Sequence, residues 1–152
     1  MEDYAFSATM AVSAARSGGT GAATTGKGKL EPFTFKKTVD ATSMSLAFHA
    51  AAGTIFKNIV VNVFATLAEK GQHAPKRFLT IVMGGAVINS CSFSGGGGDD
   101  LPTEDISITY GAIEYKYSGF KVNEKDGSIT PGGTGTSSQF QWNTITNTGS
   151  KA

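Results

Sequence analysis

The chain has 152 residues, the length of one typical domain, and only 16% of them carry a charged side chain. Its formal net charge of +1 gives no reason to expect nucleic acid or an acidic membrane surface as a partner. Because freely soluble monomers usually have charge-rich surfaces, this weak charge favours a protein that covers part of its surface with copies of itself.

The N-terminal third of the sequence predicts two strands separated by a long loop. Large and small side chains alternate over residues 4–12, which is the pattern of a half-buried strand. Residues 16–29 are rich in Gly, Thr, Ser and Lys, and we expect them to form a long flexible loop of the kind that usually has a function. A short strand is then predicted over residues 33–38.

One helix is predicted, over residues 43–52. Alanine, the strongest helix former, occurs repeatedly in it. Thr42 or Asp40 can cap its start, and Gly53 can end it.

The remaining two thirds of the chain consist mainly of predicted strands. They span residues 58–65, 77–83, 86–93, 104–117 and 139–147, with a two-residue hairpin turn expected at Gly84–Gly85. Residues 69–75 and 123–138 are expected to be polar turns or loops. Many strands, one helix and short connections predict a mainly β fold, a small barrel of two packed antiparallel sheets, in a single domain over residues 1–152.

The longest predicted strand changes face in its middle. Ile106, Ile108 and Tyr110 alternate on one side, and after Gly111 and Ala112 the large residues resume one position out of step, at Ile113, Tyr115 and Tyr117. Since the side-chain period of a strand is two, one extra residue reverses the face. We therefore expect a β-bulge at Gly111–Ala112 that bends the strand.

Two glycine-rich segments resemble ligand loops without meeting their requirements. Residues 21–27 fit the start of a phosphate-binding loop, but Gly28 follows where Ser or Thr should hold magnesium, and no helix is predicted behind it. Residues 95–100 end in Asp99 and Asp100, and two adjacent carboxylates do not supply the six or more oxygens that calcium needs. We expect neither a cofactor nor a metal ion.

The residues that most often perform catalysis form no recognisable arrangement. His49 and His73 have no Cys, His or carboxylate at ligand spacing, and Cys91 lies inside an apolar strand pattern, where a buried structural thiol is expected. A single cysteine excludes an intramolecular disulfide. The N-terminus has no basic and apolar signal-peptide pattern, and no stretch approaches the ~18 apolar residues of a membrane span. We expect a protein that is not an enzyme and does not insert into a membrane.

Several segments, taken together and in order, resemble the haemolysin-coregulated proteins (Hcp), the tube proteins of type VI secretion. They are FTFKKTVD at residues 33–40, the helix start at residues 41–46, INSCSFSG at residues 88–95, PTEDISITYGAIEYKYS at residues 102–118, and a closing segment with Trp142. The resemblance covers residues 2–147, and its specificity lies in the order and spacing of the segments.

The resemblance implies a structural protein that moves through a secretion machine. Six Hcp protomers close head to tail into a ring, and the rings stack into a tube that is wrapped by contractile sheath proteins and capped by a spike protein. The tube leaves the bacterial cytoplasm without a cleaved signal peptide, and members of the family also carry small effectors in the ring. A phage tail-tube protein, which shares the fold, is the alternative.

Individual roles follow from position within the family. The loop over residues 16–29 corresponds to the extended loop that reaches a neighbouring ring, and its candidate stacking residues are Arg16, Gly18, Gly19, Gly21, Lys27 and Lys29. Glu104, at the head of the long strand, is a candidate for an intersubunit contact. Relative to the family pattern we also expect the first N-terminal strand to be lacking, with the chain beginning inside the second.

Overall fold

The computed structural model describes residues 3–5, 8–13, 24–69, 72–96, 101–123, 125, 128–131 and 137–151. The chain divides into two compact units. The first unit consists of Met1–Lys57 and Gly85–Tyr110, and the second of Asn58–Gly84 and Gly111–Ala152. Strand β6 (Gln72–Ser94) contributes its first part to the second unit and its last part to the first. Each unit is described separately below.

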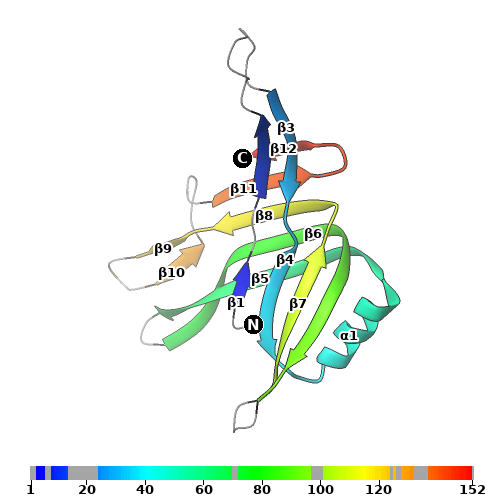
Figure 1. The fold of residues 1–152 in the computed structure, drawn as a ribbon. Coiled ribbons are helices and arrows are strands. Elements are labelled where there is room, and N and C mark those ends of the chain that lie inside the picture. Colours follow the sequence, from blue (N-terminus) through cyan, green and yellow to red (C-terminus); the bar gives the residue numbers. More distant parts are fainter. Residues whose placement is uncertain are drawn as a thin grey trace. The chain divides into compact units, whose positions relative to one another are not determined.

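The first unit contains an antiparallel sheet and the helix (Figure 1). Its strands follow the order β1 (Asp3–Ala5), β4 (Phe33–Thr38), β7 (Thr103–Thr109) and the last part of β6. Phe33, Ile106 and Ile108 are buried almost completely and form the centre of its core. Strand β2 (Ala8–Ser13) pairs separately with β3 (Thr24–Leu30).

Two expectations for the N-terminal region are wrong. The single strand predicted over residues 4–12 is two strands with different partners, since β1 pairs with β4 and β2 pairs with β3. The predicted loop of residues 16–29 ends earlier, because residues 24–29 belong to β3. Their pairing with β2, the preceding strand of the chain, outweighs the weak strand preference of Gly and Lys. Residues 14–23 lie outside the described residues.

Helix α1 (Ser43–Ala52) has the predicted bounds. Thr42 occupies the N-cap position without making a side-chain capping bond; instead, the Asp40 carboxylate accepts from the Thr42 backbone N–H (2.8 Å) and hydroxyl (2.6 Å). Gly53 ends the helix with φ 61°, in the left-handed conformation that glycine adopts without penalty.

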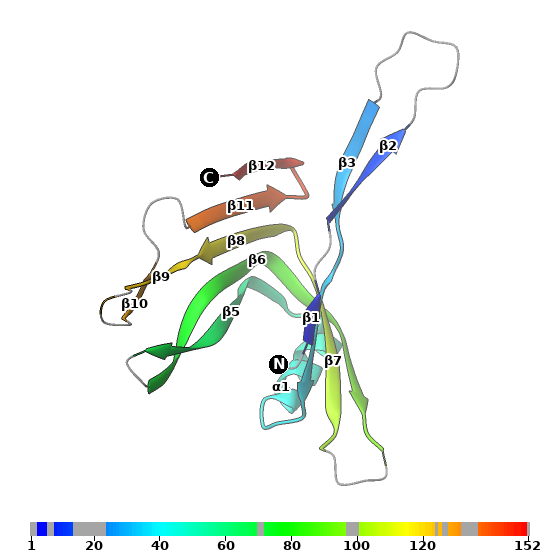
Figure 2. The same ribbon diagram turned by 90° about the vertical axis from the view of Figure 1, so that its left-hand side faces the viewer.

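The second unit contains a five-stranded antiparallel sheet in the order β5 (Ile55–Glu69), β6, β8 (Ala112–Ser118), β11 (Ser137–Asn143) and β12 (Thr148–Lys151), as Figure 2 shows. One face of this sheet is apolar. Ile81, Met83 and Ile113 are buried on it, and the rings of Tyr115 and Phe140 lie 6.2 Å apart across neighbouring strands. A short strand β9 (Phe120–Val122) pairs with β10 (Ile129–Pro131), and β10 lies within the loop predicted over residues 123–138.

The predicted hairpin at Gly84–Gly85 is wrong, because β6 runs through both residues as one strand of 23 residues. Strand β8 pairs with residues 79–84 of β6, and β7 pairs with residues 87–94. These long-range ladders on either side of Gly85 keep β6 one strand where local glycine chemistry favours a hairpin. Gly85 lies between the two ladders and adopts the left-handed conformation, with φ 58°. Strand β6 also begins at Gln72, inside the turn predicted over residues 69–75.

The predicted change of face around Gly111 is confirmed, whereas the predicted bulge is replaced by an interruption. The buried positions of β7 are even-numbered, up to Tyr110, and the buried position of β8 is Ile113. Strand β7 ends at Thr109 and β8 begins at Ala112, and the two residues between them belong to neither strand. There, the Gly111 carbonyl accepts hydrogen bonds from the Thr144 backbone N–H and hydroxyl. The register shift lies instead on β6, between Ile88 and Ser90.

The mainly β, antiparallel fold with one helix is confirmed. Because β6 pairs with both β7 and β8, the strands of the two units form one eight-stranded pairing order. Strands β1 and β12 end this order, and no pair among the described strands joins them into a hydrogen-bonded barrel. Within the described part of the chain, no helix is long and apolar enough to cross a membrane.

Candidate functional site

The predicted ring-stacking residues fall only partly within the described residues. Arg16, Gly18, Gly19 and Gly21 lie outside them, and Lys27 belongs to β3. The Lys29 ammonium lies 2.9 Å from the carboxylate of Glu31, and both side chains are exposed. An exposed pair of this kind contributes only about 0–1 kcal/mol, so Lys29 is left available to other partners.

Glu104, the candidate for an intersubunit contact, is buried. Its side chain has 0% exposed surface, and its Oε1 lies 2.5 Å from Lys37 Nζ of β4. The Ser43 hydroxyl, at the first position of α1, donates to the same oxygen (2.7 Å), and the Cys91 thiol of β6 donates to Oε2 (3.5 Å). Within the single chain this carboxylate has no exposed surface, and the intersubunit contact of Glu104 stays a prediction.

Lys37 and Glu104 stabilise each other in their charged forms. Burial alone would raise the pKa of Glu104, but hydrogen bonds from Lys37 and Ser43 outweigh it and lower the pKa below its usual value. Burial alone would lower the pKa of Lys37, and the carboxylates of Glu104 and Asp40 raise it overall. Both groups are therefore ionised over the ordinary pH range, as a paired buried charge requires.

Cys91 is held as a thiol by the same surroundings. Burial raises its pKa, and so does its hydrogen bond to Glu104. Since the thiolate is the nucleophile, a raised pKa makes this cysteine unreactive. The cluster of Lys37, Ser43, Cys91 and Glu104 thus joins the start of α1 to three strands, which is a structural arrangement.

The sequence contains a signal for this cluster, namely a carboxylate at a core-facing position of a strand. Glu104 shares the even-numbered positions of Ile106 and Ile108, which were assigned to one face of the strand. A carboxylate on a core-facing position requires a cation and hydrogen-bond donors. Lys37, on the odd-numbered core face of β4 with Phe33 and Phe35, is the matching cation.

Exposed apolar side chains mark surfaces suited to protein contact. Met44 and Phe48, one turn apart on α1, are 64% and 66% exposed. Other large exposed apolar residues are Ile55, Phe93 and Leu101 in the first unit, and Val60, Phe64, Tyr117 and Ile145 in the second. Such residues are common at interfaces between subunits.

The sheet of the second unit ends in two strands that each have one partner. Strand β5 pairs only with β6, and β12 pairs only with β11, among the strands that the structure describes. Every residue of β12 is exposed. A strand of this kind presents a row of unpaired backbone N–H and C=O groups, which is a template for pairing with another chain.

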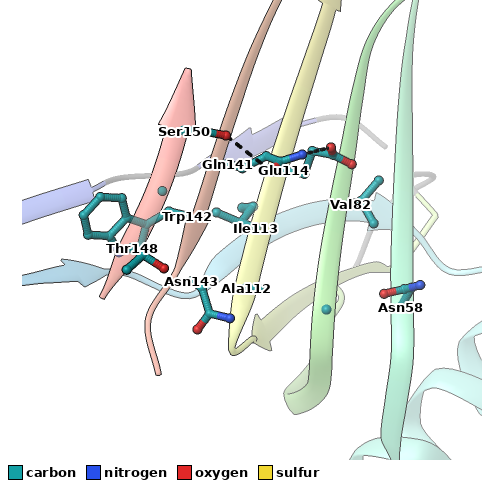
Figure 3. A pocket seen from close by; sticks show the side chains of 12 residues that line it. Asn58, Val82, Ala112, Ile113, Glu114, Gln141, Trp142, Asn143, Thr148 and Ser150 are labelled. Carbon is teal, nitrogen blue, oxygen red and sulfur yellow. Dashed lines mark hydrogen bonds between the residues drawn. The ribbon is translucent and has the colours of Figure 1, made fainter. Parts of the chain in front are cut away.

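The second face of this sheet holds a pocket of about 510 Å³ (Figure 3). We call this face the polar face. Its pocket-lining side chains are Asn58, Val82, Ala112, Glu114, Gln141, Asn143, Thr148 and Ser150. Gln139 and Gln141 donate to Glu114, the first at 2.6 Å, and Lys116 lies 2.8 Å from the same carboxylate. The Lys116 contact, which outweighs burial, lowers the pKa of Glu114.

Trp142 and Gly149 form a cross-strand pair beside the pocket. A Cβ at position 149 would lie 2.3 Å from the Gln141 carbonyl oxygen and 2.5 Å from Cε3 of Trp142. The position therefore requires glycine for packing reasons, because the indole occupies the space of a side chain. The indole N–H is buried and has no hydrogen-bond partner in the described part of the chain.

No arrangement for metal or nucleotide binding is found in the residues that can be described. They contain no group of three or more His, Cys, Asp or Glu side chains that could hold a metal ion. Lys27 and its neighbours belong to a strand, whereas a phosphate-binding loop requires a helix start. His49 contacts the Thr54 hydroxyl (3.1 Å) and packs between Phe48 and Phe56. His73 belongs to β6, and residues 97–100 lie outside the described residues.

The chemistry of the site does not identify the family of this chain, but a match to a family model does. The model described as "Type VI secretion system effector, Hcp" matches residues 1–117. The chain belongs to the Hcp family. It is a tube protein of type VI secretion, and the family is one of structural proteins that are secreted through this system.

Solved structures agree on the fold. A structure described as that of a type six secretion system protein is 23% identical, with a TM-score of 0.74 over 97% of this chain and 83% of that chain. Hcp1 from Salmonella typhimurium is 13% identical, with a TM-score of 0.58 over 96% and 81%. A further Hcp protein is 14% identical, with a TM-score of 0.59 over 86% and 73%. Comparison with curated proteins finds no match.

Proposed function

We propose that this Hcp chain forms a closed ring of six copies, in which β12 of one copy pairs with β5 of the next. The observation that carries the proposal is the pair of unpartnered edges of the five-stranded sheet. The two edges are different strands, so the contact is heterologous, and such a contact gives a ring when its rotation closes.

The surface chemistry supports a contact between copies. Val60 and Phe64 are more than half exposed on β5, the strand proposed to meet the neighbouring copy. Burying them against a second chain would remove apolar area from water, at about 25 cal/mol per Å². The low content of charged residues reduces the number of charges that such an interface must desolvate.

The further partners follow from the family. Rings stack into a tube, with the β2–β3 segment and its candidates Arg16, Gly18, Gly19, Gly21, Lys27 and Lys29 contacting the next ring. Sheath proteins surround the tube, a spike protein caps it, and small effectors occupy its lumen. The protein acts as a structural component without catalysis, assembles in the bacterial cytoplasm, and then leaves the cell in the tube.

Cysteine cross-linking tests the proposed edge contact directly. In a Cys91→Ser background, Ser150→Cys on β12 is combined in turn with Asn58→Cys, Val60→Cys or Asn62→Cys on β5. These positions share the polar face, since Thr80 on that face donates to Asn62 and Gln141 pairs with Ser150. Oxidation should give a covalent ladder that ends at six chains for at least one pair.

Each single-cysteine variant is the matched control and can give no product beyond a dimer. Mass photometry of the same samples separates the two parts of the proposal. Monomers at every salt and protein concentration would exclude the ring. Six-membered rings that give no ladder with any pair would leave the ring intact and exclude the β5–β12 contact.

A further inference from the structure

The pocket on the polar face is built from side chains that form hydrogen bonds without adding net charge. We propose that it binds a short uncharged oligosaccharide. The proposal concerns the second unit, and the pocket residues Asn58 and Ser150 lie on β5 and β12, the strands of the proposed contact between copies. The volume of about 510 Å³ lies within the usual range for small-ligand sites of roughly 300–1,000 Å³. A pocket of that size can hold two or three sugar rings.

The charge of the pocket selects against ionic ligands. Glu114 is its only charged lining residue, and its carboxylate already pairs with Lys116 at 2.8 Å. Gln139 and Gln141 also donate to this carboxylate. An anion would meet the ionised Glu114, and a cation would have to displace Lys116. A neutral ligand avoids both costs.

Polar groups remain available on opposite sides of the pocket. The side chain of Asn58, on β5, makes no hydrogen bond to another described side chain. Asn143, on β11, uses its Oδ1 to accept from the Ile145 and Thr146 backbone N–H groups at 2.9 and 3.1 Å, which leaves its Nδ2 to donate. Figure 3 shows both amide side chains, together with Gln141 linked to Glu114 and Ser150. Amides can donate and accept, as sugar hydroxyls require.

The position of the pocket favours a polyol over a peptide. The middle of the pocket lies over β8 and β11, which use their backbone groups to pair with each other and with β6 and β12, whereas Asn58 and Ser150 of its lining come from the edge strands β5 and β12. A peptide that adds to a sheet needs the unpaired backbone of an edge. Side chains that converge from several strands over the small residues Gly84 and Ala112 suit instead a compact ligand with hydroxyls in several directions.

The chain contains its own reporter for this site. Trp142 is the only tryptophan of the sequence and pairs with Gly149 beside the pocket, between the pocket residues Gln141 and Asn143, so its fluorescence can be titrated with cellotriose, maltotriose or N,N′,N″-triacetylchitotriose. We expect a saturable change with at least one of these sugars, at millimolar concentration. Asn58→Ala and Asn143→Ala should each weaken the apparent affinity about five-fold, the effect of one lost hydrogen bond.

Asn89→Ala is the matched control, because Asn89 is an exposed asparagine of β6 in the first unit, outside the pocket. It should leave the titration unchanged. No saturable change up to 50 mM of any of the three sugars would overturn the proposal. Equal effects of all three asparagine variants would also overturn it. Capped triglycine that binds as tightly as the best sugar, with the same dependence on Asn58, would show that the ligand is a peptide.

Discussion

The two units hold their outer elements by different physical means. In the first unit, the start of α1 is joined to the sheet by the buried carboxylate of Glu104, with Lys37 and Ser43 as partners. In the second unit, β12 is held by the packing of Trp142 over Gly149. The first arrangement depends on charge and therefore on pH, whereas the second depends on shape. Each can be broken without touching the other.

The largest expected effect comes from removing the carboxylate in the first unit. Glu104→Ala leaves the Lys37 ammonium, which is only 13% exposed, without its closest partner. Breaking a buried ion pair in this way should lower the free energy of unfolding by about 3 kcal/mol. Urea denaturation followed by circular dichroism measures the change.

The matched control for this variant is Asp105→Ala, at the next position of β7. Asp105 lies 3.7 Å from Lys36, and both side chains are exposed, so the loss should be at most about 0.5 kcal/mol. Equal losses for the two variants would show that the burial of Glu104 has no energetic consequence.

A smaller effect is expected from the shape-dependent contact in the second unit. In Gly149→Ala the new Cβ would overlap the Gln141 carbonyl and the Trp142 ring, so β12 must shift. Overpacking of this kind should cost about 2 kcal/mol. Thermal denaturation measures the loss, and Trp142 emission shows whether the indole is displaced. Gly96→Ala, which places a Cβ in open space, should be nearly neutral.

A still smaller loss of stability is expected from a substitution at Gly85, where β6 passes from one unit to the other. Gly85 has φ 58° with open space around its Cα, so alanine there meets backbone strain and no steric overlap. Gly85→Ala should reduce stability by about 1 kcal/mol. A change as large as that of Gly149→Ala in the same denaturation assay would mean that the turn-like geometry of Gly85 matters more than its surroundings indicate.

The smallest effect, and the one that most directly separates charge from shape, is the pH dependence. The folded-state pKa of Glu104 is lowered, so its stabilisation is present above its unfolded pKa of about 4.5 and is lost as the pH falls through the lower folded value. In Glu104→Gln the urea midpoint should therefore fall less between pH 6 and pH 4 than in the unmodified chain. Gly149→Ala should retain the original pH slope.

The pH experiment also has a contribution from Asp40. Hydrogen bonds from Thr42 and Lys37 lower the pKa of Asp40 to about 2, so its stabilisation is lost between about pH 4 and pH 2. Measurements at or above pH 4 therefore report mainly on the other carboxylates. An unchanged slope in Glu104→Gln over that range would mean that Glu104 is not the group responsible.

The local elements could be predicted where the sequence signal is itself local. Helix α1 has its predicted bounds because alanine content and Gly53 act within one or two turns of the chain. The change of face around Gly111 was also visible, since alternation of side chains is a property of neighbouring residues. The pairing of β1 with β4 was not visible, because it joins Tyr4 to Phe35 across the two intervening strands β2 and β3.

Gly85 and Glu104 are two residues whose surroundings could not be predicted from local sequence patterns. Adjacent glycines at positions 84 and 85 predict a turn, yet β6 continues past both residues as one strand, because it pairs with β8 up to Gly84 and with β7 from Val87 onward. From its position within the family pattern, Glu104 is predicted as a candidate for an intersubunit contact, whereas in the structure its side chain is buried. Its burial depends on Lys37, 67 positions earlier, and on Ser43 of the helix.

The sequence by itself determined the strand-rich composition, the single helix and the membership of the Hcp family, because these depend on residue order and short-range preference. Only the tertiary structure decided which strands remain unpaired, where the carboxylate of Glu104 lies and which side chains converge on the pocket. The physical reason is that strand pairing and the burial of charge are settled by contacts between residues far apart in the chain, whose energies no local pattern encodes.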